Sequence, residues 1–284
     1  MSFFCAALRP GYHPGTDDVY NMTGRPRGIT LIINNASFTL HPKHGQQSPR
    51  HGSEEDVRQV EALFTDLDFS VRTKENLSRK ELLDELDHVA CQDHSAYDCF
   101  MLWLMSHGRS GEVFCSDGNT VPIQTLHDMF SNCGTLIDKP KLFFIQACRG
   151  DGEDQGVSVA TDTAGSSCKQ LSPNQSEFPM DAVKKPVPRV TVVPTHADFL
   201  YAFSTVDEYV SYRHKALGSY YVRGLVEAFR ERADYDHLLD ILTVVNQKVS
   251  NMEAKMSSVE NKNEIKICKQ MPEVKHTLRK KVLF

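Results

Sequence analysis

The chain has 284 residues, which is enough for one large domain or two small ones. Hydrophobic residues make up 40% of the chain and charged residues 24%, so a folded core is expected and wholesale disorder is excluded. The 32 Lys and Arg residues against 37 Asp and Glu give a net charge of −5, which argues against a nucleic-acid-binding protein with its strong basic field.

Residues 1–27 are rich in Gly, Pro and polar side chains and predict a loose N-terminal arm. The apolar stretch at residues 3–8 has no basic leader and is too short for a secretory signal. The sequence contains no run of about 18 apolar residues, which is the length that predicts a membrane-spanning helix. We therefore expect an intracellular, cytoplasmic protein without a membrane partner.

A strand, a helix, a strand, a helix and a strand are predicted next, at residues 28–33, 53–67, 69–72, 78–90 and 99–105. The first and last of these strands are almost wholly apolar, which is typical of strands buried on both faces of a parallel sheet. The two helices repeat apolar residues at spacings of three and four. Glu54, Glu55 and Asp56 lie in the first turn of the first helix, where negative charge stabilises the helix dipole.

The middle of the chain continues with a hairpin, a short helix and another buried strand. Asp117-Gly118-Asn119 is a favourable hairpin turn between short strands at 113–115 and 120–122. Residues 123–130 predict the helix, and the apolar run at 141–145 predicts the strand.

Residues 151–189 are dominated by Gly, Ser, Pro, Asp and Thr and lose all apolar periodicity. A loop of this length inside a compact domain is typically functional or a linker, and its exposure favours proteolytic cutting. Order returns with a strand at 198–204, helices at 219–231 and 237–252, and a last strand over 276–284.

Strands that alternate with helices, joined by crossover connections, predict an α/β fold. We expect a largely parallel central sheet flanked by helices on both faces. In such folds the reacting groups lie just beyond the carboxyl ends of the strands, so the residues that follow the buried strands are the first candidates for a site.

Cys148 follows the strand at 141–145 and His107 follows the strand at 99–105, so neighbouring strands would bring both to one edge of the sheet. A thiolate is a nucleophile, and an imidazole beside it can take its proton. The backbone N–H groups of Gly108 and Cys148 are candidate donors to an oxyanion. Taken alone, a buried cysteine and a structural histidine are the commoner interpretation of such a pair.

The eight cysteines form no C-x-x-C pair, and none lies at a zinc-ligand spacing from a histidine. Gln146-Ala147-Cys148-Arg149-Gly150 fits the caspase signature Q-A-C-[RQG]-G, and His107 lies 41 residues upstream of the cysteine, near the expected spacing of about 50. With RGITLIINN, SHG, PKLFFIQACRG, ADFLYAFST and VSYR, the chain resembles the caspases, which are aspartate-directed cysteine proteases, from about residue 25 to residue 284.

Within the family, LLDILTVVNQKVSN and KQMPEVKHTLRKKVLF resemble the initiator caspases of death-receptor signalling. ADFLYAFST and the short N-terminal arm are more similar to the executioners. The resemblance implies the caspase-like sandwich, with Cys148 as nucleophile, His107 as its partner, and Gly108 and the Cys148 amide as the oxyanion hole. It implies neither a metal nor an organic cofactor.

The resemblance also implies a pocket for the substrate aspartate, built from Arg50, Gln146 and Arg213 with Ser211 beside it. Guanidinium groups bind carboxylates bidentately, and two of them in a desolvated pocket would reject a neutral side chain. Tyr212 stands where executioners usually have Trp, which bears on the pockets upstream of the cleaved aspartate. A loop over residues 251–270 would shape the most distant pocket.

Caspases are made as zymogens that are cut after aspartate. The resemblance predicts four segments: an arm or pro-segment at 1–27, a large catalytic subunit at 28–162, an excisable linker at 163–181 and a small subunit at 182–284. Asp162 and Asp181 are the predicted cleavage sites in the linker, and Asp17 or Asp18 could release the arm.

The function predicted in this way is a caspase that cleaves proteins after aspartate and acts in apoptosis. Its expected partners are protein substrates, a second copy in a homodimer of large and small subunits, and an upstream activating caspase. An alternative from another class is a catalytically silent caspase-like regulator that dimerises with an active caspase. A related peptidase that cuts after basic residues is disfavoured because Arg50 and Arg213 would repel a basic side chain.

Overall fold

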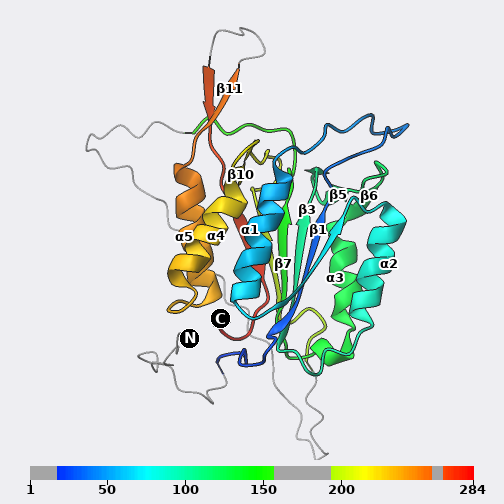
Figure 1. Ribbon diagram of the computed structural model, residues 1–284, viewed down its shortest axis with the longest axis vertical. Helices are drawn as coiled ribbons and strands as arrows, with labels where there is room; N and C mark the ends of the chain where they lie inside the picture. The colour runs from blue at the N-terminus through cyan, green and yellow to red at the C-terminus, as the bar shows by residue number, and fades with distance from the viewer. Residues whose placement is uncertain (1–17, 157–192, 258–264) are drawn as a thin grey trace, which may run out of the picture.

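The computed structural model describes residues 18–156, 193–257 and 265–284. A six-stranded sheet lies at its centre (Figure 1). In sheet order its strands are β13 (Glu273–His276), β8 (Phe199–Phe203), β7 (Lys141–Gln146), β3 (Cys99–Met105), β1 (Gly28–Asn34) and β2 (Ser70–Glu75). The ladders from β8 to β2 are parallel, and only the edge strand β13 is antiparallel to its neighbour.

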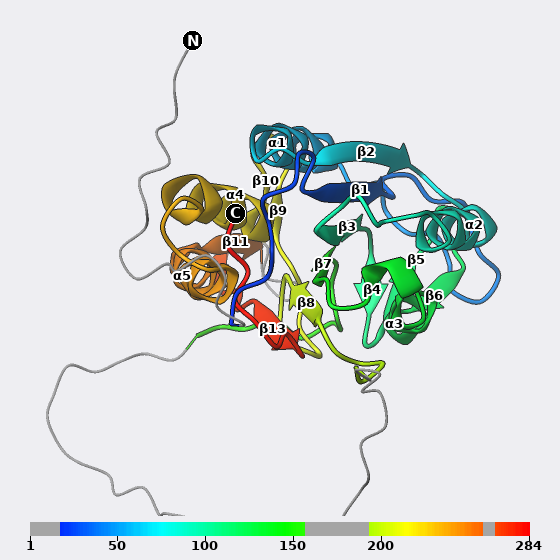
Figure 2. The same cartoon turned by 90° about the horizontal axis from the view of Figure 1, so that it is seen from below.

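Helices cover both faces of this sheet (Figure 2). One face carries α1 (Ser53–Asp66), α4 (Tyr220–Arg232) and α5 (Leu238–Asn251), and the other carries α2 (Arg79–Ala90) and α3 (Ile123–Ser131), with a 3₁₀ turn at Gly134–Leu136. Alternate residues of the buried strands divide between the two cores: Trp103 and Phe144 pack toward α1, α4 and α5, whereas Phe100 and Phe143 pack toward α2 and α3. The predicted α/β fold is confirmed.

Three small sheets accompany the central one. β4 (Gly108–Arg109), β5 (Glu112–Phe114) and β6 (Thr120–Pro122) form the first, β9 (Arg213–His214) pairs with β10 (Gly218–Ser219), and β11 (Ala254–Ser257) pairs with β12 (Ile265–Cys268). The stretch 251–270, expected as a loop, therefore contains a hairpin, which projects from one end of the molecule in Figure 1.

The strand predicted over 276–284 is wrong beyond His276. Its last ladder contacts are made by Thr277, whose N–H donates to Phe199 O at 2.8 Å and whose carbonyl accepts from Asp198 N at 3.0 Å. The chain then turns onto the helical face, where Val282 and Phe284 are buried and the Phe284 ring lies 5.3 Å from that of Phe229. Lys281 forms an isolated parallel bridge with Val19, and the apolar residues that follow are buried against the helices instead of in a ladder.

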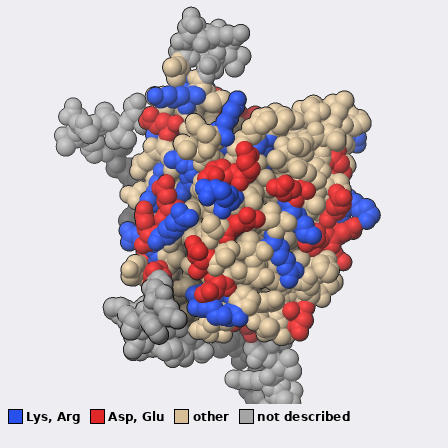
Figure 3. Space-filling model, in the orientation of Figure 1, with Lys and Arg blue, Asp and Glu red and all other residues tan. Residues whose placement is uncertain are grey.

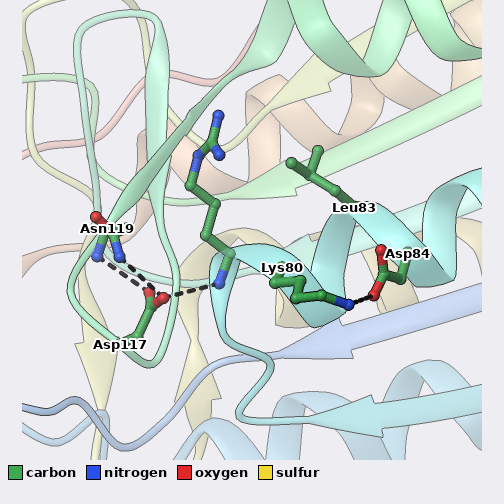
Figure 4. A pocket seen from close by; sticks show the side chains of 6 residues that line it. Lys80, Leu83, Asp84, Asp117 and Asn119 are labelled. Carbon is green, nitrogen blue, oxygen red and sulfur yellow. Dashed lines mark hydrogen bonds and ion pairs between the residues drawn. The ribbon is translucent and has the colours of Figure 1, made fainter.

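Local chemistry fixes the ends of the elements. Ser78 and Glu81 form a capping box at the start of α2, and the Arg79 N–H donates to the Asp117 carboxylate at 3.2 Å. Figure 4 shows this contact at the side of a hollow of about 360 Å³, in which Lys80 and Asp84 also pair. These polar groups are hydrogen-bonded to one another, and the bond between Arg79 and Asp117 connects the hairpin turn to the start of α2.

Acidic and basic side chains are intermixed over the face seen in Figure 3, without a broad field of one sign on the described residues. None of the helices in the described segments has the length and apolar character that crossing a membrane requires. Within those same segments, His, Cys, Asp and Glu side chains form no group of three or more that could hold a metal ion.

Candidate active site

The parallel ladder between β3 and β7 determines where His107 and Cys148 lie. Met105 pairs with Gln146, so His107 and Cys148 both follow at the same edge, two residues beyond their strand partners. The backbones touch there, because a Cβ added to Gly108 would lie 2.5 Å from Cys148 O. Only glycine fits this close approach to the Cys148 carbonyl.

His107 is oriented from one side by a backbone carbonyl. Its Nε2 lies 2.8 Å from Ser48 O, and since a carbonyl only accepts, the neutral ring carries its proton on Nε2. Nδ1 is then the nitrogen left to accept a proton. The Phe38 ring packs against the imidazole with centroids 5.0 Å apart.

Burial lowers the pKa of His107, and the positive charges of Arg50 and Arg213 lower it further, while the bond to Ser48 O acts in the opposite direction. The imidazole is therefore held neutral at neutral pH, which is the form that a general base requires.

Cys148 is half-buried and its sulfur faces the segment that follows β8. The Ser211 N–H donates to Sγ at 3.4 Å, and Ser211 O lies 3.9 Å from the same sulfur. The next residue, Arg149, is buried, ion-paired with Glu273 on β13, and stacked at 4.2 Å on the Phe203 ring. The loop that carries the thiol is thus anchored to two further strands.

Arg50 is 1% exposed, although nothing in its sequence neighbourhood predicts burial. Its Nη1 donates to Asn34 Oδ1 at 2.9 Å and to Asn35 O at 3.0 Å. Its Nη2 is buried without a hydrogen-bond partner. Burial, and then the neighbouring Arg213, lower the pKa of Arg50 to about 9. A buried cationic donor without a hydrogen-bond partner is a candidate binding site for an anion.

Arg213 and Gln146 complete this cluster. Arg213 lies on β9, where its Nε donates to His51 O at 3.0 Å, and burial lowers its pKa. The Gln146 Nε2 donates to Ser211 Oγ at 2.8 Å, and its Oε1 is buried without a partner. Rotating the amide by half a turn would let Ser211 donate to Oε1 and would free Nε2 for a carboxylate.

Tyr212 lies beside this cluster but points into a separate small core. It is 8% exposed and packs with Ala254 and Cys268 at the base of the β11–β12 hairpin. Its N–H donates to Gln270 Oε1 at 2.7 Å. Burial raises the pKa of its hydroxyl, and the neighbouring Cys268 raises it further.

Among the predicted cleavage sites, Asp162 and Asp181 lie outside the described residues. Asp18 is exposed, and its carbonyl accepts a hydrogen bond from Lys281 N at 2.8 Å. The start of the described chain is therefore attached to the C-terminal segment.

Sequence reasoning missed the groups that orient the predicted ones: Ser48, Phe38, Asn34 and Arg149. Ser48 acts through its backbone carbonyl, which no residue type signals. Asn34 was visible only as the end of a strand, and Arg149 only as part of the signature around Cys148.

Comparison with known proteins gives a consistent result. The family model described as "Caspase domain" matches residues 27–283. The chain is 33% identical over 276 residues to caspase-8 of Rattus norvegicus, which covers 95% of this chain and 53% of that protein. It is 34% identical over 270 residues to caspase-3 of Bos taurus, with 94% and 88% covered. The chain thus spans about half the length of the caspase-8 relatives and most of the caspase-3 relative.

Proposed function

This chain belongs to the caspase family, and we propose that it is an active cysteine endopeptidase that cleaves protein substrates after aspartate. The observation that carries the proposal is the pair of arginines beside a thiol and an imidazole. The buried Nη2 of Arg50 has no hydrogen-bond partner among the described residues, so the proposed pocket is incomplete until an anionic side chain enters it.

The proposed chemistry uses the thiol, the imidazole and two backbone N–H groups. His107 Nδ1 takes the proton of the Cys148 thiol, and the thiolate attacks the carbonyl carbon of the scissile peptide bond. The N–H groups of Gly108 and Cys148 stabilise the oxyanion, and the imidazolium then gives its proton to the leaving amine. Water attacks the thioester that remains, and His107 acts as the base a second time.

Specificity follows from the charge of the pocket. An aspartate carboxylate would accept from Arg50 Nη2, from Arg213 and from the rotated amide of Gln146, with Ser211 holding that amide. An asparagine side chain would leave the two guanidinium charges unpaired in a desolvated site, and a lysine side chain would be repelled.

The direct test is cleavage of a peptide library by the purified protein. We expect a strict requirement for aspartate, and no cleavage by the Cys148→Ser variant. A wild-type protein that binds peptides ending in aspartate but cleaves none would instead indicate a silent caspase-like regulator. Cleavage after other residues would exclude the assigned pocket.

Maturation is part of the same proposal. Residues 28–162 would form the large subunit and 182–284 the small one, with cuts after Asp162 and Asp181 and removal of the arm after Asp18. An upstream caspase could make these cuts. The mature enzyme would act in apoptosis as a cytoplasmic homodimer, and the outer edge of β13 is the place where the central sheet could continue into a second copy.

A further inference from the structure

Asp56 is a buried carboxylate that the reaction described above does not use. It lies in the first turn of α1 and is 0% exposed. Its Oδ1 accepts from Ser219 N at 2.6 Å, and its Oδ2 accepts from the Ser219 hydroxyl at 2.5 Å. Both oxygens thus accept from one residue of β10, which is 163 positions further along the chain.

The contact continues through β10 to the aspartate pocket. Ser219 pairs with Arg213 in the antiparallel ladder between β9 and β10. Gly218 has a φ of +80°, and a Cβ added there would collide with Asp56 Oδ1, so the glycine lets the strand approach the carboxylate closely. Asp56 therefore fixes, through one residue, the strand that carries Arg213.

Asp56 also balances the charges of the pocket. Arg50 and Arg213 repel each other, as the lowering of the pKa of Arg50 by Arg213 reflects. Asp56 is the largest stabilising charge for each of the two guanidiniums, ahead of Cys148 for both and of Glu54 for Arg213. Burial raises the pKa of Asp56, whereas the two hydrogen bonds from Ser219 and the charges of Arg50 and Arg213 favour its ionised form. With Asp56 ionised, two cations and one anion leave one net positive charge, which a single substrate carboxylate would neutralise.

We propose that Asp56 is a positioning residue of the aspartate pocket, which holds the β9–β10 strands through Ser219 and offsets the repulsion between Arg50 and Arg213 so that both face one substrate carboxylate. The inference rests on the proposed function, since it assigns a specificity role within that pocket. Arg213 depends on Asp56 more than Arg50 does, because within the described segments its side chain makes a single hydrogen bond, to His51 O.

Two substitutions separate charge from geometry. In Asp56→Asn, the amide oxygen can accept from Ser219 N and the amide N–H can donate to the Ser219 hydroxyl, so both hydrogen bonds survive while the charge is lost. In Ser219→Ala, the carboxylate and its bond from the backbone N–H remain and the hydroxyl bond is lost. Asp66→Asn, at the exposed end of the same helix, is the matched control.

For Asp56→Asn we expect KM for an aspartyl peptide to rise at least about tenfold, with kcat changed less than about threefold, because loss of one member of a buried charge cluster weakens binding. The rate at which iodoacetamide, a neutral reagent, alkylates Cys148 should stay unchanged. Ser219→Ala should raise KM by a smaller factor, and Asp66→Asn should leave both constants as in wild type.

A double-mutant cycle with Arg213→Gln, measured as kcat/KM at high enzyme concentration, distinguishes positioning from general support of the fold. If Asp56 acts through Arg213, Asp56→Asn has little further effect in the Arg213→Gln background. An equal effect in both backgrounds, or a KM of Asp56→Asn equal to that of wild type, overturns the inference. If Asp56→Asn does not fold, Ser219→Ala decides by its KM.

Failure of the proposed function gives a different result. Wild-type protein that cleaves no aspartyl peptide contradicts the enzyme assignment itself. Wild-type cleavage with unchanged constants for both variants contradicts only the role of Asp56.

Discussion

Arg50 is a buried cation whose hydrogen bonds to the protein are incomplete. Its guanidinium is buried, two of its hydrogen bonds go to the end of β1 and the residue that follows, and one nitrogen is left without a partner. The protein therefore tolerates the cost of a desolvated cation that its own residues only partly compensate. In the proposed pocket, that nitrogen is the donor offered to a substrate carboxylate.

Arg50→Gln should lower kcat/KM for an aspartyl peptide at least about thirtyfold, since removal of one partner of a desolvated charge pair costs about 2–5 kcal/mol. The comparison is Arg58→Gln on α1, whose side chain is 69% exposed and pairs only with Glu55, and which should change kcat/KM less than twofold. Steady-state kinetics of both variants decides. Equal kinetics for Arg50→Gln and wild type would remove Arg50 from the pocket.

The pH dependence of activity is a second prediction at the residue scale. Protonation of His107 removes the base, and burial together with Arg50 and Arg213 lowers its pKa below the ordinary 6.5. The acid limb of kcat/KM, which reports the free enzyme, should therefore lie below pH 6.5. A bound aspartate carboxylate offsets the two arginines, so the acid limb of kcat should lie at a higher pH than that of kcat/KM.

The test is to measure kcat and kcat/KM against pH with one aspartyl peptide. The carboxylate of the peptide titrates near pH 3.9, so its own titration does not overlap the acid limb of His107. A limb of kcat/KM above pH 6.5 would mean that the imidazolium is stabilised in the free enzyme, contrary to the positive surroundings described here.

At the scale of elements, the junction between β3 and β4 carries Gly108, one of the two proposed oxyanion donors. Gly108→Ala places a methyl group 2.5 Å from Cys148 O, against backbone that cannot move freely. We expect kcat to fall at least about a hundredfold, which is the effect of losing one oxyanion donor. Gly134→Ala is the control, because its Cβ would meet nothing within 4 Å and kcat should be unchanged. A Gly108→Ala enzyme with normal kcat would place the donors elsewhere.

The elements themselves show what the sequence could predict. β1, β3 and β7 are buried on both faces, so their continuous apolar runs gave the correct strands, and the parallel sheet then placed His107 and Cys148 at one edge. The strand predicted beyond His276 was wrong because Val282 and Phe284, at the apolar end of the chain, are buried against helices after the chain has left the sheet.

The site was predictable only where a residue type carries the chemistry. The caspase signature led to the positions of the thiol, the imidazole and both arginines. Ser48 contributes a carbonyl, which any residue has. Asp56 was interpreted from its position in the first turn of a helix, yet its carboxylate turns to Ser219, because only the fold brings β10 to α1.

For the whole molecule, the predicted cuts after Asp162 and Asp181 would divide a single sheet. β7 would belong to the large piece and β8 to the small piece, and these strands form a parallel ladder of five residue pairs. Contacts at the site cross the same division, since Gln146 bonds to Ser211 and Arg149 pairs with Glu273. The two pieces should therefore stay associated after cleavage, because separating them would expose the shared core.

We expect the wild-type protein to yield two fragments on a denaturing gel that elute together in native gel filtration. The variant with both Asp162→Ala and Asp181→Ala should remain one chain.

The doubly substituted protein still contains Asp151 and Asp154 before the linker. Neither should be cut, because Asp154 bridges to Lys269 and the Gly152 N–H donates to Glu208 O at 2.8 Å. A peptidase needs an extended, unpaired segment, and this one is already paired. If the double variant gives fragments that end at Asp151 or Asp154, these contacts open during maturation. If the two wild-type fragments separate on the gel-filtration column, the sheet is not shared between two subunits.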